Sequence, residues 1–429
     1  MSTTSPSWGK RPHRLLAMGE AWEVVRNGVL ESAMGGFHGT PKVGIETVPI
    51  GECIGRVLAC PVITDDDYPA FDKSMMDGFA VRSADCAAAG SRLKICGLIV
   101  AGRTTNTTIG CGEAMQINTG AAIPSGADAV VRIEDCEVDA DSVVLRVAVA
   151  QGKNASRQGS DRRRGDVVLT PPLRIGAAQI AAAATAGAAT LEVANQVQVA
   201  LVSTGDELVR AGETRRFGQI YDSNGPMLSA MMREFGASPR PPSSAPDELE
   251  ALIATLRNAM ECPIVLTVGG MSMGTHDLVP QAFESLGVKW RFHGVSMRPG
   301  KPMAYGVGPD GQQVFGLPGN PVSAFVCAWL FVRMAIRGLQ GFEPLPPRTV
   351  RVTLAEEIKA HRDSRPAYVP AKVWSDEARG LLAAPTKWSG SSDPFGLAEA
   401  NALLCLLNPD TAAPAGSGVE VIPTTGGFD

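Results

Sequence analysis

Apolar runs, glycine-rich loops and helical patterns alternate between residues 197 and 345. The runs VQVALV (197–202), PIVLTV (263–268) and QQVFGL (312–317) lead into the loops STGDEL, GGMSMG and PGNP. A segment with helical periodicity follows each loop, and this order is typical of a parallel sheet covered by helices on both faces. We therefore predict a parallel three-layer α/β domain over residues 197–345, with a ligand site beyond the carboxyl ends of its strands.

The rest of the chain has a different texture. A helical pattern begins near Leu15, whereas residues 43–165 carry short Val/Ile stretches broken by Gly, Pro and Asp, which is typical of β structure. Residues 177–187 predict a compact helix, and the Pro-rich connector 341–350 precedes a last segment of short strands. Because 429 residues exceed what one core usually needs, the fold class we predict is α/β multidomain.

Composition and charge exclude several classes of protein. The formal net charge of -5 argues against broad nucleic-acid binding, which requires clustered Lys and Arg. The nine cysteines form no C-x-x-C pair, which favours free thiols in a reducing compartment. The N-terminal segment lacks the apolar stretch of a secretory signal, and the apolar run 177–189 is too short to span a membrane. We therefore predict a cytoplasmic protein that contacts neither nucleic acid nor membrane.

The loop STGDEL places Asp206 and Glu207 directly after a predicted buried strand. Two adjacent carboxylates can bind a hard cation through oxygen ligands. Acidic residues also favour the first turn of a helix, so helix N-capping is the alternative.

The stretch LTVGGMSMGTHDL carries a second candidate site. Gly269 and Gly270 permit close backbone approach, and Ser272 with the following N–H groups can face an anion, although a plain tight turn explains the glycines equally well. Asp277 is either a second carboxylate near the same crevice or a solvated helix cap. His276 has no second His at ligand spacing, so a zinc site is not expected.

Two Pro-Gly turns are candidates for anion binding. The loop GLPGNP forms a rigid turn that leads into a helix N-terminus, which suits a preformed anion or pterin pocket; its residues are Pro318, Gly319, Asn320 and Pro321. The turn RPGK places Arg298 and Lys301 on either side of Pro-Gly, so that two positive groups can converge on one oxyanion. An ordinary solvated turn is the alternative.

Seven motifs follow one another along the chain: FDKSMMDGFAVR, INTGAAIPSGADAVV, STGDEL, GQIYDSN, GGMSMG, RPGKP and FGLPGNPVSA. In this combination the chain resembles the MoeA and gephyrin E-domain family, from about Ala21 to the ANALL stretch at 400–404. The resemblance implies an elongated, L-shaped, four-domain subunit. It also implies a homodimer whose active site lies between the third domain of one subunit and the second domain of its partner.

The four domains that this resemblance implies follow the chain order, with one discontinuous domain. They are an N-terminal linker and dimer domain (15–60 plus 162–196), a β-rich domain (61–161), a MogA-like molybdopterin-binding α/β domain (197–345) and a C-terminal β-barrel-like domain (346–429).

The resemblance also implies an activity, that of a molybdopterin molybdenumtransferase. Members of the family take adenylylated molybdopterin as substrate, hydrolyse the adenylate with Mg²⁺ and transfer molybdenum from molybdate to the pterin, a step of molybdenum cofactor biosynthesis. The expected cofactor is therefore Mg²⁺, and the expected partners are a MogA-like molybdopterin adenylyltransferase and molybdoenzymes or their chaperones.

Site residues are carried over from the family position by position. The positions that match catalytic acidic and hydroxyl residues are Asp77, Thr119, Asp161 and Glu207. The acidic residue after GGMSMG is Asp277, which joins Asp206 and Glu207 as an expected metal ligand. The expected oxyanion-binding set is Arg298, Lys301, Arg365 of SRPAY and Ser391 of SGSS.

The chain departs from the family pattern at several positions. The family usually has Asn at Lys73, a more basic run at residues 155–158, and Lys near Gly294. Ser244 and Ala245 stand where an acidic pair is expected, and Pro370 replaces the second Arg of RxEFxR. These losses of charge leave two alternatives to the transferase: a non-catalytic pterin-binding or scaffold paralogue, and a tungsten-selective relative.

Overall fold

The computed structural model describes residues 14–32, 43–246, 248–271 and 278–425. The chain divides into two compact units with separate cores. Unit 1 consists of residues 1–47, 55–59 and 192–429. Unit 2 consists of residues 48–54 and 60–191.

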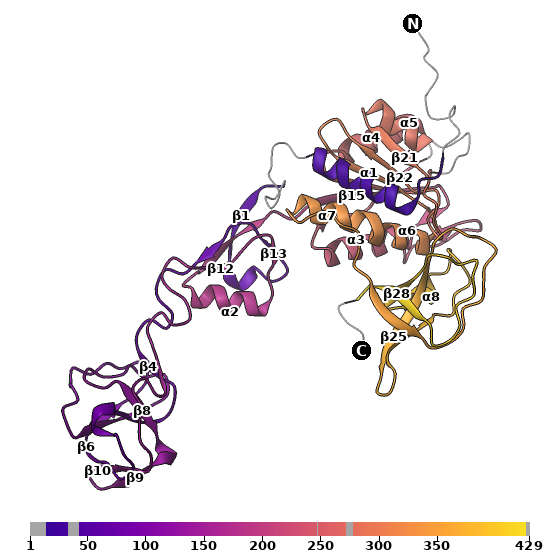
Figure 1. Ribbon diagram of the computed structural model, residues 1–429. Helices are drawn as coiled ribbons and strands as arrows, with labels where there is room; N and C mark the ends of the chain where they lie inside the picture. The colour runs from indigo at the N-terminus through magenta and orange to yellow at the C-terminus, as the bar shows by residue number, and fades with distance from the viewer. Residues whose placement is uncertain (1–13, 33–42, 247, 272–277, 426–429) are drawn as a thin grey trace. The chain divides into compact units, whose positions relative to one another are not determined.

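A seven-stranded sheet with the order β18-β15-β20-β23-β22-β21 forms the centre of the α/β domain in unit 1, and β19 pairs with β15 (Figure 1). Its strands are β15 (Gln198–Thr204), β18 (Ser238–Pro239), β19 (Ser243–Ala245), β20 (Ile264–Val268), β21 (Lys289–His293), β22 (Ala304–Val307) and β23 (Gln313–Leu317). The strands β18, β19, β15, β20 and β23 are parallel, as predicted. The strand β22 runs antiparallel to β21 and β23, and the segments 294–303 and 308–312 that connect these three strands contain no crossover helix.

Helices cover both faces of this sheet, which gives the predicted three layers. They are α1 (Met18–Glu31), α3 (Asn224–Glu234), α4 (Leu249–Ala259), α5 (Leu278–Ser285), α6 (Pro321–Cys327) and α7 (Arg333–Leu339). Alternate residues of β15 enter two cores: Leu201 packs in the cluster that includes α1, α3, α6 and α7, and Val202 packs in the cluster that includes α4 and α5. In Figure 1, α4 and α5 lie above β15, and α3, α6 and α7 lie below it.

The sequence prediction of a helix directly after STGDEL is wrong. Residues after Thr204 form a turn that leads into β16 (Leu208–Val209), which pairs with β17 (Ile220–Tyr221), and α3 begins only at Asn224. The pairing of Leu208 with Ile220 uses backbone groups that a helix would have used internally.

A single helical run joins α6 and α7 through the π-helical segment Ala328–Val332. The run Pro321–Leu339 has 19 residues and a mean hydropathy of 1.6, so length and composition alone would allow it to cross a membrane. However, 83% of that window is buried inside the protein, which is typical of a core helix.

The C-terminal part of unit 1 is a closed barrel with the order β24-β26-β25-β27-β28. Its elements are β24 (Val350–Leu354), β25 (Ala367–Asp376), β26 (Gly380–Pro385), α8 (Pro394–Ala398), β27 (Ala402–Leu406) and β28 (Gly418–Pro423). Barrel residues Tyr368, Leu403 and Ile422 belong to the same buried cluster as α6 and α7, so the barrel packs against the α/β domain.

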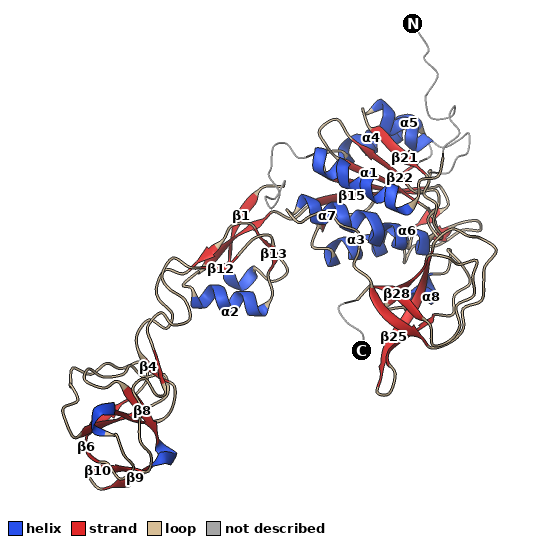
Figure 2. Cartoon of the chain, in the orientation of Figure 1, coloured by secondary structure: helices blue, strands red, loops and turns tan. Residues whose placement is uncertain are grey.

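Unit 2 contains a six-stranded sheet with the order β8-β5-β7-β6-β10-β9. The strands are β5 (Gly78–Val81), β6 (Arg92–Ile99), β7 (Glu113–Ile117), β8 (Ala129–Arg132), β9 (Cys136–Asp139) and β10 (Ser142–Leu145). Phe79 and Ala80 pack in different buried clusters, so both faces of the sheet are covered. The β-rich texture of this region is confirmed (Figure 2).

Three small sheets and one helix complete the fold. A four-stranded sheet has the order β1-β14-β2-β13, and β11 pairs with β4 and β12 with β3. Their bounds are β1 (Ile45–Pro49), β2 (Val57–Leu58), β3 (Val62–Ile63), β4 (Lys73–Ser74), β11 (Ala155–Ser156), β12 (Val167–Leu169), β13 (Leu173–Arg174) and β14 (Thr190–Ala194). The predicted helix of small residues is α2 (Ala177–Thr185). The domain boundaries drawn from the resemblance stay a prediction.

Candidate functional site

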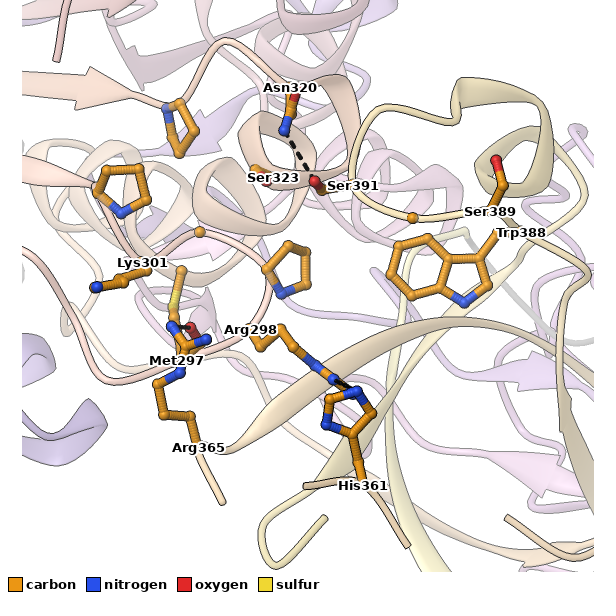
Figure 3. Close-up of a pocket in the computed structure, with 15 residues that line it drawn as sticks. Met297, Arg298, Lys301, Asn320, Ser323, His361, Arg365, Trp388, Ser389 and Ser391 are labelled. Carbon is orange, nitrogen blue, oxygen red and sulfur yellow. Dashed lines mark hydrogen bonds between the residues drawn. The ribbon is translucent and has the colours of Figure 1, made fainter. Parts of the chain in front are cut away.

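A cavity of about 590 Å³ lies in unit 1 at the start of α6, between the α/β domain and the barrel. Figure 3 shows side chains from four segments of the chain around it. The lining residues are Met297, Arg298, Pro299, Gly300, Lys301, Pro302, Pro318, Asn320, Ser323, His361, Arg365, Trp388, Ser389, Gly390 and Ser391.

Backbone hydrogen bonds bring these segments together. Arg298 donates its N–H to the Pro366 carbonyl at 2.9 Å, and Tyr368 donates its N–H to the Arg298 carbonyl at 2.8 Å. On the other side, Val322 donates its N–H to the Ser391 carbonyl at 3.0 Å, and the Asn320 amide donates to the Ser391 hydroxyl at 2.9 Å. The barrel therefore holds the turn RPGK and the start of α6 on opposite sides of one cavity.

Gly300 shapes the turn that carries the two cations. Its φ is +109°, a backbone conformation that residues with a Cβ rarely adopt. A Cβ at Gly300 would also lie 2.2 Å from the Met297 methyl carbon and 2.8 Å from the Cys327 sulfur. Glycine is thus required for the turn to pack on α6 while Arg298 and Lys301 face the cavity.

The charge of the cavity is positive. Within the part of the chain that the structure describes, neither Arg298 nor Lys301 forms an ion pair, and no Asp or Glu lines the cavity. Hydrogen bonds to Asp363 and Met297 orient the Arg365 side chain. Its Nε donates to both carboxylate oxygens of Asp363, at 2.9 and 3.1 Å, and its Nη1 donates to the Met297 carbonyl at 3.2 Å. Hydrogen bonds from the Arg365 side chain hold the pKa of the Asp363 carboxyl well below its ordinary value.

The predicted oxyanion set is therefore brought together. Arg298, Lys301, Arg365 and Ser391 line one cavity with Pro318 and Asn320. The loop GLPGNP leads directly into a helix, as predicted: Asn320 is the N-cap of α6 and Pro321 its first residue. Several residues of the cavity wall were not predicted, among them Ser323, His361 and Trp388.

The glycine-rich loops meet beside this cavity, at the carboxyl ends of the parallel strands. Gly269 has a φ of +89°, and a Cβ there would lie 2.8 Å from the Thr204 carbonyl oxygen. Gly270 has a φ of +60°, and a Cβ at Gly319 would lie 3.9 Å from the Gly269 Cα. The Asn224 amide, at the start of α3, donates to the Gly319 carbonyl at 2.6 Å. The described parts of the loops after β15, β20 and β23 therefore lie together at the carboxyl edge of the sheet.

Asp206 and Glu207 lie in the exposed turn after β15. Since no helix follows this turn, the helix N-capping alternative for these two residues is wrong. The Glu207 carboxylate lies over Gly205, where a Cβ would stand 2.5 Å from Oε2. The predicted ligands Ser272 and Asp277, and also His276, lie outside the described residues. Among the described residues, no three His, Cys, Asp or Glu side chains cluster as a metal site.

Three predicted catalytic residues belong to unit 2. Thr119 donates its backbone N–H to Asp77 Oδ1 at 2.8 Å, and both residues are exposed. The exposed Asp161 carboxylate accepts a hydrogen bond from the Ser160 hydroxyl at 3.2 Å. Asp77 and Thr119 thus form a local pair, whereas Asp161 lies on a separate loop.

The chain thus combines a three-layer α/β domain, glycine-rich loops beyond its parallel strands, and a cationic cavity between that domain and a barrel. These features are those of a multidomain protein that binds an anionic ligand. Residues 16–187 match the MoeA N-terminal region (domain I and II), residues 200–338 a probable molybdopterin binding domain, and residues 351–424 the MoeA C-terminal region (domain IV). The chain belongs to the MoeA family.

Individual relatives match over most of their length. The molybdopterin molybdenumtransferase of Staphylococcus aureus is 34% identical over 88% of this chain and 91% of its own length. The Staphylococcus epidermidis protein of the same name is 33% identical over 88% of this chain and 90% of its own length. The crystal structure of a molybdopterin biosynthesis MoeA protein from Pyrococcus horikoshii has a TM-score of 0.77 at 30% identity and covers 96% of this chain and 100% of that one.

Proposed function

We propose that this chain is a molybdopterin molybdenumtransferase, which transfers molybdenum from molybdate to adenylylated molybdopterin with release of AMP. The observation that carries the proposal is the cavity that Arg298, Lys301 and Arg365 line together, next to the glycine-rich loops. Molybdate is a tetrahedral dianion, and a cavity lined by cations and donors, without a carboxylate among its described residues, suits such a ligand. The glycine-rich loops beside it would hold the pterin substrate.

Asp206 and Glu207 suit Mg²⁺ by their donor type. Both are exposed carboxylates at the carboxyl end of β15, and Mg²⁺ usually binds to one or two carboxylates together with substrate phosphates. Asp277 joins this set by the resemblance. When bound, Mg²⁺ neutralises charge on the phosphate oxygens of the adenylate. The two carboxylates would also orient the phosphates relative to the oxyanion cavity.

We further propose a homodimer in which Asp77, Thr119 and Asp161 of one subunit complete the site of the other. These residues are exposed on unit 2, and the resemblance assigns them catalytic roles. Sedimentation at micromolar concentration tests this arrangement. A monomer that still turns over substrate would refute the shared site.

One contact bears on the alternative that the departures have abolished catalysis. Lys73 of β4 pairs in register with Ser156 of β11. The resemblance expects a basic residue on β11, and this chain carries a lysine on the paired strand β4, so one positive charge remains on this pair of strands. Gly294 and Pro370 do not line the cavity. We therefore favour the transferase over the scaffold paralogue.

Other parts of the proposal rest on the resemblance alone. These parts are a cytoplasmic location, a separate molybdopterin adenylyltransferase that supplies the substrate, and molybdoenzymes or their chaperones that receive the product. Tungstate has nearly the size and charge of molybdate. Direct competition between the two oxyanions for the protein is therefore the experiment that distinguishes a tungsten-selective protein from a molybdenum-selective one.

Molybdate binding to single variants tests the cavity. The Lys301→Ala and Arg298→Ala proteins should each bind molybdate about tenfold more weakly, since a hydrogen bond to a charged group contributes roughly 1.5–3 kcal/mol. The Lys359→Ala protein, which loses an exposed lysine outside the cavity, is the matched control. Unchanged affinity in both cavity variants would show that RPGK is only a solvated turn.

A further inference from the structure

His361 lines the cavity, and N–H groups face both nitrogens of its ring. The backbone N–H of Asp363 donates to Nδ1 at 3.0 Å. On the other side of the ring, the Arg298 guanidinium Nη1 contacts Nε2, as Figure 3 shows.

A neutral imidazole has one donor and one acceptor nitrogen, so it cannot accept from both groups. The Asp363 N–H belongs to the backbone that leads into β25 and stays beside Nδ1, whereas Arg298 has a long side chain that can shift. The tautomer that fits this backbone has a lone pair on Nδ1 and a proton on Nε2. The His361 Nε2–H and the Arg298 Nη1–H then point at each other at the exposed rim of the cavity, so one acceptor placed between them would receive both hydrogen bonds.

The protein offers few acceptors at this point. No Asp or Glu is among the described residues that line the cavity. The nearby Asp363 carboxylate already accepts from the Arg365 backbone N–H at 3.1 Å and from the Arg365 Nε at 2.9 Å. An oxygen of a bound oxyanion would accept from both Arg298 and His361.

We propose that His361 is a specificity-determining residue of the cavity, which donates its Nε2–H to the same tetrahedral oxyanion that Arg298 binds. This inference rests on the proposed molybdate site. Beside Arg298 and His361 the described lining presents N–H donors and no carboxylate, which favours a fully deprotonated oxyanion, because the O–H of hydrogen phosphate would have to reach a serine hydroxyl elsewhere in the cavity. The ligand class is thus molybdate and its close analogues rather than phosphate.

Calorimetric titration of the full-length protein with molybdate and with phosphate tests the proposal. In His361→Asn the side-chain oxygen takes the place of Nδ1 and the donor toward Arg298 is lost, so molybdate affinity should fall about tenfold or more, as expected for a lost hydrogen bond to a charged group. In His361→Gln the amide nitrogen reaches the Nε2 position, so affinity should stay within about threefold of the unmodified protein. Arg362→Gln, which removes a neighbouring cation outside the cavity, is the control and should bind molybdate normally.

The outcomes separate this inference from the proposed function. If the unmodified protein does not bind molybdate, the oxyanion site itself fails. If it binds molybdate and His361→Asn binds equally well, only the role of His361 is refuted, and phosphate affinity equal to that for molybdate would refute the ligand class.

The ring tautomer gives a second readout that does not depend on a variant's stability. Nitrogen-15 spectra of the molybdate complex should show His361 with its proton on Nε2 and a molybdate-dependent shift of that nitrogen. A proton on Nδ1 would mean that Nε2 accepts from Arg298, which would overturn the proposal.

Discussion

Gly300→Ala is the substitution that most directly tests how the fold builds the cavity. At a φ of +109°, a residue with a Cβ costs roughly 1–3 kcal/mol. The new Cβ would meet the Met297 methyl and the sulfur of Cys327, a fully buried residue of α6, and overpacking of this kind costs about 1–3 kcal/mol. The two costs together predict a loss of roughly 2–5 kcal/mol in the free energy of unfolding of unit 1.

Tryptophan fluorescence during urea unfolding measures the loss of stability of unit 1. Unit 2 contains no tryptophan, whereas Trp329 and Trp388 belong to unit 1, so the signal follows unit 1. Gly212→Ala is the matched control, because Gly212 has a φ of +93° and nothing within 4 Å of an added Cβ. Gly212→Ala should therefore lose only the stability that the positive φ costs a residue with a Cβ.

A double variant separates the steric part of the cost. Cys327→Ala removes the sulfur, so Gly300→Ala combined with Cys327→Ala should show a favourable coupling energy relative to the two single variants. Molybdate affinity of Gly300→Ala should also fall about tenfold, because the turn carries Arg298 and Lys301. The role assigned to Gly300 would be refuted if Gly300→Ala lost no more stability than Gly212→Ala and bound molybdate as tightly as the unmodified protein.

Two further predictions concern single side chains. Glu207→Gln should lower the rate of AMP release by about tenfold or more, near 1.4 kcal/mol in the transition state, and leave the melting temperature unchanged because no helix follows Glu207; full activity would show that this carboxylate is dispensable. Burial raises the pKa of Cys86 and Cys136 to about 11, so both stay neutral thiols at pH 8 and gain reactivity only as the pH approaches that value. Iodoacetamide at pH 8, followed by peptide mass spectrometry, should therefore modify the exposed Cys111 first, and early labelling of Cys86 would contradict the burial.

Local sequence patterns predicted the strands and loops that carry the site. Apolar runs such as 263–268 end at glycines whose positive φ the structure requires, so the glycine-rich loops at the strand ends followed from the sequence. The turn RPGK was predictable for the same reason, since its geometry depends on neighbouring residues. Thr204 to Asp222 was predicted wrongly, because the pairing of β16 with β17 joins residues that are not adjacent in the chain.

Long-range contacts account for what the sequence did not predict. His361 reaches Arg298, 63 residues earlier, because Ala367 at the start of β25 pairs with Arg298 of the turn RPGK. Asp363 and Trp388 enter the site region in the same way, through the barrel. No periodicity or spacing encodes where a barrel lies against an α/β domain, so these residues carried no local signal.

The central claim is that this protein transfers molybdenum to the pterin. The most direct measurement incubates the full-length protein with adenylylated molybdopterin, Mg²⁺ and molybdate, and then quantifies the AMP released and the molybdenum bound to the pterin. We predict that both products form together and that Lys301→Ala lowers both. A protein that binds adenylylated molybdopterin but releases no AMP and leaves the pterin without metal would contradict the transferase and favour a scaffold paralogue.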